Sequence, residues 1–529
     1  MTKLGGHVST GDGGIILKIL HKSYEFVAFP NFHVMLRRFE TMGAFVIALV
    51  RMSGEINLKQ RRTRASFMSR FFRNLQDAAT TLGTKVTVRE RWSRVFLETE
   101  KPQDLETLVR TFGIRSLSPV EHVCPPTFAA MKEQLAVYAE IVQGRTFCLR
   151  VKRVNVRENG LRSIDYEREL AYVLMPFARG VALKKPDIQI EIELRPDGAY
   201  FFHRRLMGPG GLPIGVEGRA LCLMSGGFDS PVAAWRIMKR GVEVDFVFFN
   251  LAGASYERSV LRVTKHLCQM WAHGYKPRIW IVDFADLSKQ ILQIPKKNFA
   301  QVVLKRLMYR AANEIARRNH HHALITGEAI GQVSSQTLEN LAAIDESAQI
   351  PVLRPLIGMD KDEIVDLASE IGTAAMSSKI QEYCALIQKR PITATTAGMA
   401  GHQESYIDPN YLDSALENAR CLDVKSLTDD AMMDQYVFVD GIPAGDVAVY
   451  DLRTPLQFQS GHVAGARLLD PDRVMKSLDA FDKNRTHIFY CAFGMQSAVL
   501  AEQLQNLGFK AFGVRGGTSA LDLQPNLLN

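Results

Sequence analysis

Cysteine is scarce in this sequence, and the cysteines that occur are not paired along the chain. The 529 residues contain seven cysteines, none spaced as CxxC, which argues against a zinc site and a thioredoxin-like motif. A set so sparse and odd in number is typical of reduced, intracellular proteins. The chain also lacks a run of about 18 apolar residues and a secretory signal pattern. We therefore expect a soluble, cytoplasmic protein with no membrane span and no metal site formed by cysteines.

The length and charge of the chain limit its architecture and its partners. A chain of 529 residues is too long for one hydrophobic core, so three or four domains are expected. With 47% hydrophobic and 23% charged residues, its composition is that of folded globular proteins. The formal charge of +9 favours a polyanionic partner such as a nucleic acid. On charge alone, a basic enzyme without such a partner is the alternative.

The pattern of strands, helices and polar stretches divides the chain into six segments. Regular alternation of strands and helices in the fourth segment predicts a parallel, doubly wound sheet. The segments are an extension or misassigned start (1–43), two α+β units (44–120 and 121–212), the doubly wound α/β domain (213–395), a linker (396–430) and a smaller α/β unit (431–529).

If residues 1–43 are misassigned, Met42 or Met52 would be the true start.

Within the first two α+β units, several elements can be placed. We expect a helix over 64–82, one strand over 86–98 and a helix over 128–142, from the apolar periodicity of each stretch.

The most specific motif is Ser225-Gly226-Gly227-Phe228-Asp229-Ser230. It follows an apolar strand and precedes a helix in which Ser230 is expected as N-cap and Pro231 at the first position. Consecutive glycines let the backbone wrap around an anion, and the helix N-terminus adds partial positive charge. The spacing differs from the Walker loop and resembles the PP-loop of ATP pyrophosphatases. Asp229 would then lie beside the pyrophosphate and help to hold Mg²⁺; an ordinary glycine turn is the alternative.

Polar or glycine-containing segments follow the later strands of this domain, where ligands of open α/β sheets bind. They include Phe248-Phe249-Asn250, Thr326-Gly327-Glu328 and the amide-rich and hydroxyl-rich stretch from Gly331 to Thr337. Lys305 and Arg306 lie on an amphipathic helix over 301–318, either at the site or as solvated surface charges. The histidines at 320–322 are expected to form an exposed turn rather than a metal site.

Two cysteines have a functional context. Cys491 ends an apolar strand and is followed by a short loop and a helix, so backbone N–H groups would surround its sulfur and stabilise an anionic persulfide. Asp451-Leu452-Arg453 and the segment from Gly461 to Ala466 complete the likeness to a rhodanese domain. Cys384 lies at the end of the doubly wound domain, where a buried structural thiol and a redox role are both open.

Basic residues gather in the first two α+β units. They are Arg61, Arg62, Arg64, Arg70 and Arg73 in the first, and Arg150, Lys152, Arg153 and Arg157 in the second. Alternation along a strand would put Arg150 and Lys152 on one face. Such groups suit phosphate contacts, with a solvated charged face as the alternative.

The order of these parts resembles that of the tRNA 4-thiouridine synthetases. The likeness covers nearly everything after residue 44 and implies four domains: ferredoxin-like, THUMP (RNA-binding), PP-loop ATP pyrophosphatase and C-terminal rhodanese-like. Besides the PP-loop it rests on Arg51-Met52-Ser53-Gly54-Glu55-Ile56, Phe147-Cys148-Leu149-Arg150-Val151-Lys152-Arg153, Thr326-Gly327-Glu328-Ala329, the segment from Gly331 to Thr337, Arg354-Pro355-Leu356 and Glu382-Tyr383-Cys384.

The resemblance implies roles for particular residues. Asp229 and Lys361 would be essential, Cys491 would carry a persulfide, and Cys384 would form a transient disulfide with it. The ATP contacts would be made by the PP-loop residues Ser225, Gly226, Gly227 and Ser230 together with Leu223, Met224, Phe248, Phe249, Lys305, Gly327 and Gln336. One departure is that the Cys491 loop has no arginine, where many rhodaneses place one, so thiosulfate is expected to be a poor sulfur donor.

The activity implied is the ATP- and Mg²⁺-dependent formation of 4-thiouridine at tRNA position eight. Uridine would be adenylated, and sulfur supplied by a cysteine desulfurase would displace AMP. The family is also linked to thiazole (thiamine) synthesis through a sulfur-carrier protein, and a carrier role without tRNA modification is the alternative. An amidotransferase-like synthetase is disfavoured because a rhodanese-like unit stands where a glutaminase would be needed. Family members often form homodimers, which the sequence leaves open.

Overall fold

The computed structural model describes residues 46–521, except for the segments 92–93, 157–160, 252, 379, 381–390, 429–436, 475–477, 479–480 and 493. The expected extension (1–43), Arg157 and Cys384 therefore lie outside the described residues. The chain forms two compact units. The first includes Leu82–Val109 and Ile114–Gly208, and the second includes Ser53–Thr81, Arg110–Gly113 and the chain from Pro209 onward.

An antiparallel sheet in the first unit has the strand order β10-β4-β1-β3-β2. Its central strand β1 (Val46–Met52) pairs with β3 (Arg94–Thr99) and β4 (Ile114–Pro119), so a chain starting at Met52 would lack the middle of the sheet. The other elements are β2 (Val86–Arg91), β10 (Leu206–Met207) and the short helix α4 (Asp104–Leu108).

The expectation of one strand over 86–98 is wrong, because that stretch forms the antiparallel pair β2 and β3. Their register runs from Val86↔Thr99 to Arg91↔Arg94. The stretch has no glycine or proline to signal a turn, and such signals are what separate strands in a sequence.

A second sheet of the first unit has the order β5-β9-β8-β6-β7. Its elements are β5 (His122–Cys124), β6 (Thr146–Arg153), β7 (Gly180–Val181), β8 (Ile188–Arg195) and β9 (Gly198–Phe202), with α5 (Phe128–Leu135), α6 (Ala139–Val142) and α7 (Ser163–Ala171). The helix expected over 128–142 is interrupted by a 3₁₀ turn, η2 (Ala136–Tyr138). Along β6, Leu149 and Val151 are buried while Lys152 is exposed, so the predicted alternation holds there.

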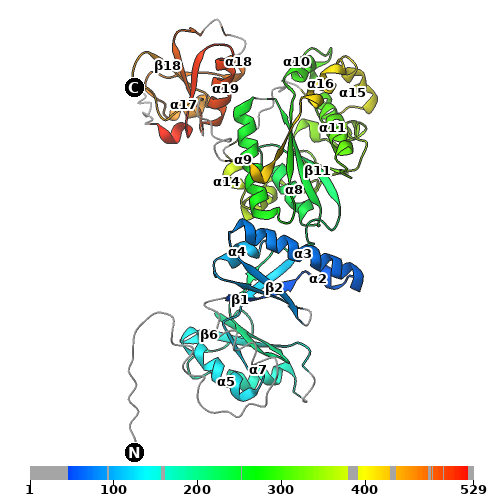
Figure 1. Ribbon diagram of the computed structural model, residues 1–529. Coiled ribbons are helices and arrows are strands. Elements are labelled where there is room, and N and C mark those ends of the chain that lie inside the picture. The colour runs from blue at the N-terminus through cyan, green and yellow to red at the C-terminus, as the bar shows by residue number, and fades with distance from the viewer. Residues whose placement is uncertain are drawn as a thin grey trace, which may run out of the picture. The chain divides into compact units, whose positions relative to one another are not determined.

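A six-stranded sheet with the order β15-β14-β11-β12-β13-β16 organises the second unit (Figure 1). All neighbouring strands are parallel except the edge pair β13 and β16. The strands are β11 (Arg219–Leu223), β12 (Glu243–Asn250), β13 (Arg278–Asp283), β14 (Leu324–Ile325), β15 (Val352–Leu353) and β16 (Arg420–Asp423). This is the doubly wound sheet that the sequence predicts.

The two faces of that sheet bury alternate residues of each strand, as the period of two requires. Cys222 and Phe246 belong to the core under α8 (Asp229–Met238), α9 (Ala254–Trp271) and α13 (Lys361–Glu370). Leu221 and Val247 belong to the core under α10 (Ala285–Ile291) and α11 (Ala300–Arg318). Parallel strands covered on both faces direct their carboxyl ends to one edge, where the cavity described below opens.

The expected linker (396–430) is described as far as residue 428, and residues 396–428 are instead part of this domain. They contain α15 (Ala397–Glu404), α16 (Asn410–Glu417), the edge strand β16 and η5 (Val424–Ser426). Ile407, Leu416 and Val424 are buried among the residues of the sheet cores. The segment is largely polar, and few of its other apolar side chains are buried. Its composition is therefore typical of a surface connection.

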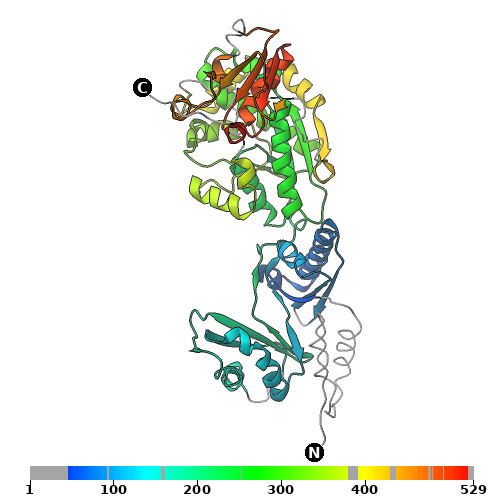
Figure 2. The same ribbon diagram turned by 90° about the vertical axis from the view of Figure 1, so that its left-hand side faces the viewer.

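The C-terminal part forms a parallel sheet with the order β17-β21-β20-β18-β19 (orange to red in Figure 1 and turned by 90° in Figure 2). The central strand β20 (Thr486–Tyr490) buries Ile488, Phe489 and Tyr490 completely. The other elements are β17 (Phe438–Val439), β18 (Val447–Asp451), β19 (Arg467–Leu468), β21 (Lys510–Val514), α17 (Pro455–Ser460), α18 (Pro471–Val474), α19 (Met495–Asn506) and η8 (Gly517–Ala520).

The remaining elements of the second unit include a long helix near its N-terminal end. They are α2 (Gly54–Asn57), α3 (Arg61–Thr81), η3 (Lys297–Phe299), η4 (Ser334–Gln336), α12 (Leu338–Asp345) and α14 (Ala374–Ser377). Arg70 and Asn74 of α3 both donate to the carbonyl of Ile214, at 2.7 Å and 3.0 Å. Among the residues that the structure describes, no helix is both long enough and apolar enough to span a membrane.

Candidate active site: a nucleotide cavity and a strand-end cysteine

The glycine loop lies between β11 and α8 and is closed by two serines. The N–H of Ser225 donates to Oγ of Ser230 at 2.9 Å, and the two hydroxyl oxygens are 3.1 Å apart. The expectation that Ser230 is the N-cap is wrong: α8 begins at Asp229, after Phe228, which makes no side-chain cap. The Ser230 hydroxyl turns back to the loop instead, so it stabilises the loop's curvature rather than the first turn of α8.

The carboxyl ends of the strands surround a cavity of about 570 Å³, a size typical of sites for small ligands. Most of the residues predicted to contact ATP line it, although the loop glycines Gly226 and Gly227 do not. The predicted residues on its wall are Leu223, Met224, Ser225, Asp229, Ser230, Phe248, Phe249, Lys305, Gly327 and Gln336. Residues far apart in the sequence thus converge on one cavity.

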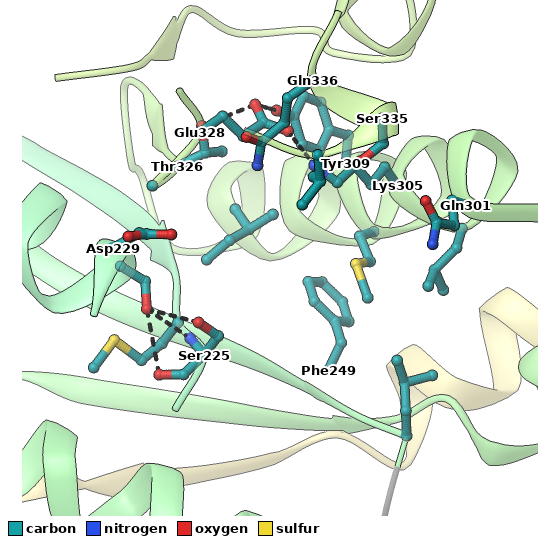
Figure 3. A pocket seen from close by; sticks show the side chains of 18 of the residues that line it. Ser225, Asp229, Phe249, Gln301, Lys305, Tyr309, Thr326, Glu328, Ser335 and Gln336 are labelled. Carbon is teal, nitrogen blue, oxygen red and sulfur yellow. Dashed lines mark hydrogen bonds and ion pairs between the residues drawn. The ribbon is translucent and has the colours of Figure 1, made fainter. Parts of the chain in front are cut away.

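The cavity has a polar end and a more apolar middle. Ser225 and Asp229 lie at one end, Gln301 lies at the other, and the ring of Phe249 lies between them (Figure 3). Leu304 and Met308 of α11 also line it. Backbone N–H groups at the α8 N-terminus suit an anion, and the apolar middle suits a planar ring.

Asp229 is held from two sides. Nζ of Lys361, the first residue of α13, lies 2.7 Å from Oδ1 of Asp229. Nε2 of Gln332 donates to the other oxygen, Oδ2, at 2.9 Å. The capping box of Asp360 and Glu363 fixes the start of α13 and therefore the position of Lys361. The structure brings together Asp229 and Lys361, which the sequence analysis named separately, and adds Gln332.

A buried carboxylate, Glu328, forms the far wall and was not singled out from the sequence. Burial raises its pKa, but the charges of Lys305 and Arg354 outweigh that effect and lower the pKa to about 2. Lys305 Nζ lies 2.7 Å from Oε1, and Arg354 Nε lies 2.9 Å from Oε2. The hydroxyls of Tyr309 and Thr326 also donate to this carboxylate, at 2.8 Å and 3.0 Å. Its place directly after Gly327 in a post-strand segment was the available signal.

The structure decides between the two interpretations of Lys305 and Arg306 on α11. Lys305 faces the cavity and pairs with Glu328, whereas Arg306 is buried at 2% exposure between Glu346 and Glu404. Neither is a solvated surface charge.

The expected exposed turn at 320–322 is wrong for His321. His321 is buried, and its Nε2 lies 2.9 Å from Oδ2 of Asp245. His320 and His322 are exposed, as expected.

Cys491 follows β20 directly, and backbone groups hold it in place. Its Sγ accepts the N–H of Gly494 at 3.1 Å, and its carbonyl accepts the N–H of Thr518 at 3.0 Å. The thiol is almost fully buried. The helix α19 begins at Met495, two residues earlier than expected, and the hydroxyl of Ser497 donates to the carbonyl of Gly494. The loop therefore directs an N–H group at the sulfur, as the sequence analysis predicted.

Arg453 connects the two upstream motifs of this domain, residues 451–453 and 461–466. Arg453 pairs with the fully buried Asp451 at 2.6 Å and donates to the carbonyl of Gly461 at 2.6 Å. The N–H of Val463 donates to the hydroxyl of Tyr490, the residue before Cys491. These bonds tie the loop at 461–466 to the end of β20.

The other cysteines that the structure describes do not share this setting. Burial raises the pKa of the Cys222 and Cys268 thiols above its ordinary value. It also raises the pKa of the Cys124 thiol, to about 12. Cys421 on the edge strand is exposed. Cys384 lies outside the described residues, so its pairing with Cys491 stays a prediction.

The basic residues differ in their availability. Arg61, Arg62 and Arg73 of α3 are exposed, as is Lys152 of β6. Arg70 is instead engaged by Ile214 and Glu243. Part of the predicted basic surface is therefore free to meet phosphates, and part has a structural role.

Three family models match consecutive parts of the chain. They are the ThiI ferredoxin-like domain over residues 47–118, the thiamine biosynthesis protein ThiI over 215–408 and the rhodanese-like domain over 435–522. A tRNA sulfurtransferase of Desulfurococcus amylolyticus is 35% identical over 89% of this chain and 97% of its own length. The chain belongs to the tRNA sulfurtransferase family.

Another member of the tRNA sulfurtransferase family and one solved structure also match most of this chain. The relative from Shewanella woodyi is 33% identical over 87% of this chain and 98% of its own. A crystal structure of a 4-thiouridine synthetase–RNA complex with bound ATP matches with a TM-score of 0.62 and 30% identity, over 72% of this chain and 99% of that one. The alignments with these tRNA sulfurtransferases therefore extend over most of the chain.

Proposed function

We propose that this chain uses ATP to activate a uridine of tRNA and replaces the uracil O4 with sulfur carried on Cys491, which gives 4-thiouridine at position eight. The observation that carries the proposal is the presence, in one chain, of a phosphate-binding loop opening into a cavity of nucleotide size and of a strand-end cysteine held by backbone N–H groups. The named relatives are tRNA sulfurtransferases, and the solved neighbour holds RNA and ATP.

In this proposal ATP lies along the cavity. Its phosphates meet the loop at Ser225 and the N-terminus of α8, where N–H groups and partial positive charge favour an anion. The adenine lies toward Phe249 and Gln301, which supply a ring face and an amide. Lys305 lies on the cavity wall and carries positive charge toward the nucleotide.

The chemistry follows from the weakness of the uracil carbonyl as an electrophile. Attack of O4 on the α-phosphorus forms an O–P bond and releases pyrophosphate, which leaves C4 bonded to AMP, a competent leaving group. Sulfur then forms a bond to C4 and the C4–O bond breaks with AMP departing. Lys361 and the loop N–H groups stabilise the charge that develops on the phosphates, in the manner of fixed donors at a transition state.

Mg²⁺ fits this site as a companion of ATP. The described residues contain no cluster of three or more His, Cys, Asp or Glu side chains able to hold a metal by themselves. Mg²⁺ commonly uses one or two carboxylates and completes its ligands with phosphates and water. Asp229 is the carboxylate at the loop, and each of its oxygens retains a lone pair beside its present donor. The ion would neutralise phosphate charge there.

Sulfur delivery in this proposal begins with a persulfide on Cys491, supplied by a cysteine desulfurase. The N–H of Gly494 stabilises the anionic sulfur. Attack of the Cys384 thiolate on Sγ of persulfidated Cys491 releases the terminal sulfur for C4 and leaves a disulfide, which an external thiol reduces. The exposed arginines of α3 and Lys152 of β6 supply phosphate contacts for the tRNA.

The test is mass spectrometry of nucleosides from tRNA incubated with the protein, ATP, Mg²⁺, cysteine and a cysteine desulfurase. We expect 4-thiouridine with the wild type and none with Asp229→Ala or Cys491→Ser. Cys421→Ser, which changes an exposed cysteine, is the matched control and is expected to keep activity. Wild-type protein that is loaded with persulfide yet forms no thiouridine would refute the proposal.

A sulfur-carrier role in thiazole synthesis is a second function that we propose, because the model matching 215–408 is described as a thiamine biosynthesis protein. It needs persulfide on Cys491 but not ATP activation of uridine. The full chain with Asp229→Ala is therefore expected to lose thiouridine formation and keep thiazole-pathway sulfur transfer. Loss of both activities in this variant, with normal persulfide loading, would contradict the separate role.

A further inference from the structure

Gln332 belongs to a loop that runs from Gly327 to Thr337 beside the glycine loop. The loop is fixed mainly by backbone bonds. The N–H of Gly331 donates to the carbonyl of Gln336 at 3.0 Å, and the N–H of Gln336 donates to the carbonyl of Val333 at 2.8 Å. The side chain of Gln332 is half-buried and lines the cavity. These backbone bonds fix the main chain from which the Gln332 side chain projects.

Further contacts anchor this loop to its surroundings. The N–H of Ile330 donates to the carbonyl of Ile357 at 3.1 Å. The buried side chain of Asn340 donates to the carbonyls of Ser334, at 2.7 Å, and Ile392, at 2.9 Å. Because these bonds fix the loop, the Gln332 amide is held next to the glycine loop as a hydrogen-bond donor.

The Gln332 amide meets the carboxylate that the proposed reaction needs. Nε2 of Gln332 donates to Oδ2 of Asp229 at 2.9 Å, while Lys361 holds Oδ1 at 2.7 Å. Two donors on the two oxygens fix the plane of the carboxylate, which neither donor fixes alone. The remaining lone pairs then point in set directions along the cavity.

We propose that Gln332 is a positioning residue that orients Asp229 for the ATP-dependent step. The inference rests on the proposed function, because it assigns to Gln332 the orientation of a group that acts on the pyrophosphate end of ATP. Outer partners of this kind set the direction of a ligand or reacting group, and their loss typically costs about 10- to 100-fold in activity. Gln332 acts through Asp229 and does not itself hold the nucleotide.

The variants are Gln332→Leu, which removes the donor, and Gln332→Glu, which keeps the shape and sets a second carboxylate against Asp229. The measurements are RNA-dependent AMP formation, the KM for ATP and the unfolding midpoint. We expect kcat to fall about 10- to 100-fold in both variants, with the KM for ATP and the midpoint close to wild type. Gln349→Glu, at an exposed position of the same domain, is the matched control and keeps wild-type kinetics.

A double-mutant cycle separates positioning from a structural role. If Gln332 acts through Asp229, Gln332→Leu adds little to the loss already caused by Asp229→Asn, because the two side chains work as a unit. Additive losses would overturn the inference. A raised KM with unchanged kcat would also overturn it, because Gln332 would then be a direct ATP contact.

The same assay distinguishes this inference from the proposed function. Wild-type protein that forms no AMP in the presence of tRNA, ATP and Mg²⁺ would refute the proposed function. Active wild-type protein with an equally active Gln332→Leu variant would refute the inference alone.

Discussion

Nζ of Lys305 lies 2.7 Å from Oε1 of Glu328 on the wall of the nucleotide cavity. Glu328 is shared with Arg354, 2.9 Å away, so one carboxylate faces two cations. Arg354 turns its remaining donors to Asp345 and Tyr309. Glu328 therefore fixes the direction of Lys305 on the wall of the cavity.

The first prediction concerns that carboxylate. Glu328→Gln keeps the shape but leaves Lys305 and Arg354 without their shared charge. Removing one partner of a buried ion pair costs about 3 to 5 kcal/mol of stability, and Lys305 loses its fixed direction. We expect a raised KM for ATP and a destabilised domain. Three of the four tryptophans, Trp235, Trp271 and Trp280, lie in this domain, so denaturant unfolding can be followed by their fluorescence.

The control for this variant is Glu346→Gln, which alters an exposed partner of Arg306 on the same domain. Arg306 keeps Glu404 and the carbonyl of Ala343, so a loss below about 1 kcal/mol is expected, as for exposed ion pairs. Equal losses of stability from the two variants would contradict the prediction that Glu328 contributes more to stability than Glu346.

The second prediction is a pH dependence of stability that comes from the same residue. Burial opposes the ionised form of Glu328, but Lys305 and Arg354 lower its pKa from 4.5 to about 2, which corresponds to about 3 kcal/mol. Because the folded-state pKa is the lower one, this stabilisation is complete above about pH 4.5 and is lost as the pH falls toward 2. The difference in unfolding free energy between wild type and Glu328→Gln should therefore shrink over that range. A difference that is constant with pH would contradict it.

The third prediction tests how closely the post-strand loop approaches Asp229. A Cβ on Gly327 would lie 2.8 Å from the carbonyl carbon of Asp229 and 2.8 Å from the N–H nitrogen of Ser230. Both are backbone atoms, so Gly327→Ala must displace the glycine loop or strain it, at about 1 to 3 kcal/mol. We expect RNA-dependent AMP formation to be lost. Gly358→Ala, where a Cβ would meet nothing within 4 Å, should keep it.

The sequence predicted those parts of the site that depend on local pattern. The glycine loop, the post-strand segments and Cys491 each follow an apolar strand, and the parallel topology of the six-stranded sheet brings the first two to one edge. The family resemblance added Lys361, which no local pattern marks, and the structure places it against Asp229. For the fold, regular alternation predicted the doubly wound sheet, whereas the pair β2 and β3 was missed for want of a turn signal.

The parts that the sequence could not give depend on pairing across the fold. Gln332 stood in a segment expected at the ligand-binding edge of the sheet, but its bond to Asp229 joins residues 103 positions apart. Arginine is mostly exposed in proteins and histidine is intermediate. Arg306 and His321 are buried here because Glu404 and Asp245, respectively, reach them from distant elements. Likewise the edge strand β16 is set by pairing with β13, not by its own composition.

The last prediction separates the geometry of the Cys491 loop from backbone strain alone. Gly494 has φ +87°, and a Cβ there would lie 2.7 Å from the carbonyl oxygen of Val514. Gly508 has nearly the same φ, +86°, but a Cβ there would meet nothing within 4 Å. Strain at such a φ costs about 1 to 3 kcal/mol at either position. Only Gly494→Ala, however, must also move the N–H group that contacts the Cys491 sulfur.

We therefore expect both alanine variants to be less stable, but only Gly494→Ala to lose persulfide loading. Loading is measured as the gain of one sulfur atom in the mass of the protein after incubation with cysteine and a cysteine desulfurase. It should be read at a temperature where circular dichroism shows both variants to be folded. If Gly494→Ala loads as fully as Gly508→Ala, the Gly494 N–H is not what stabilises the persulfide anion, and that role would pass to other donors of the loop.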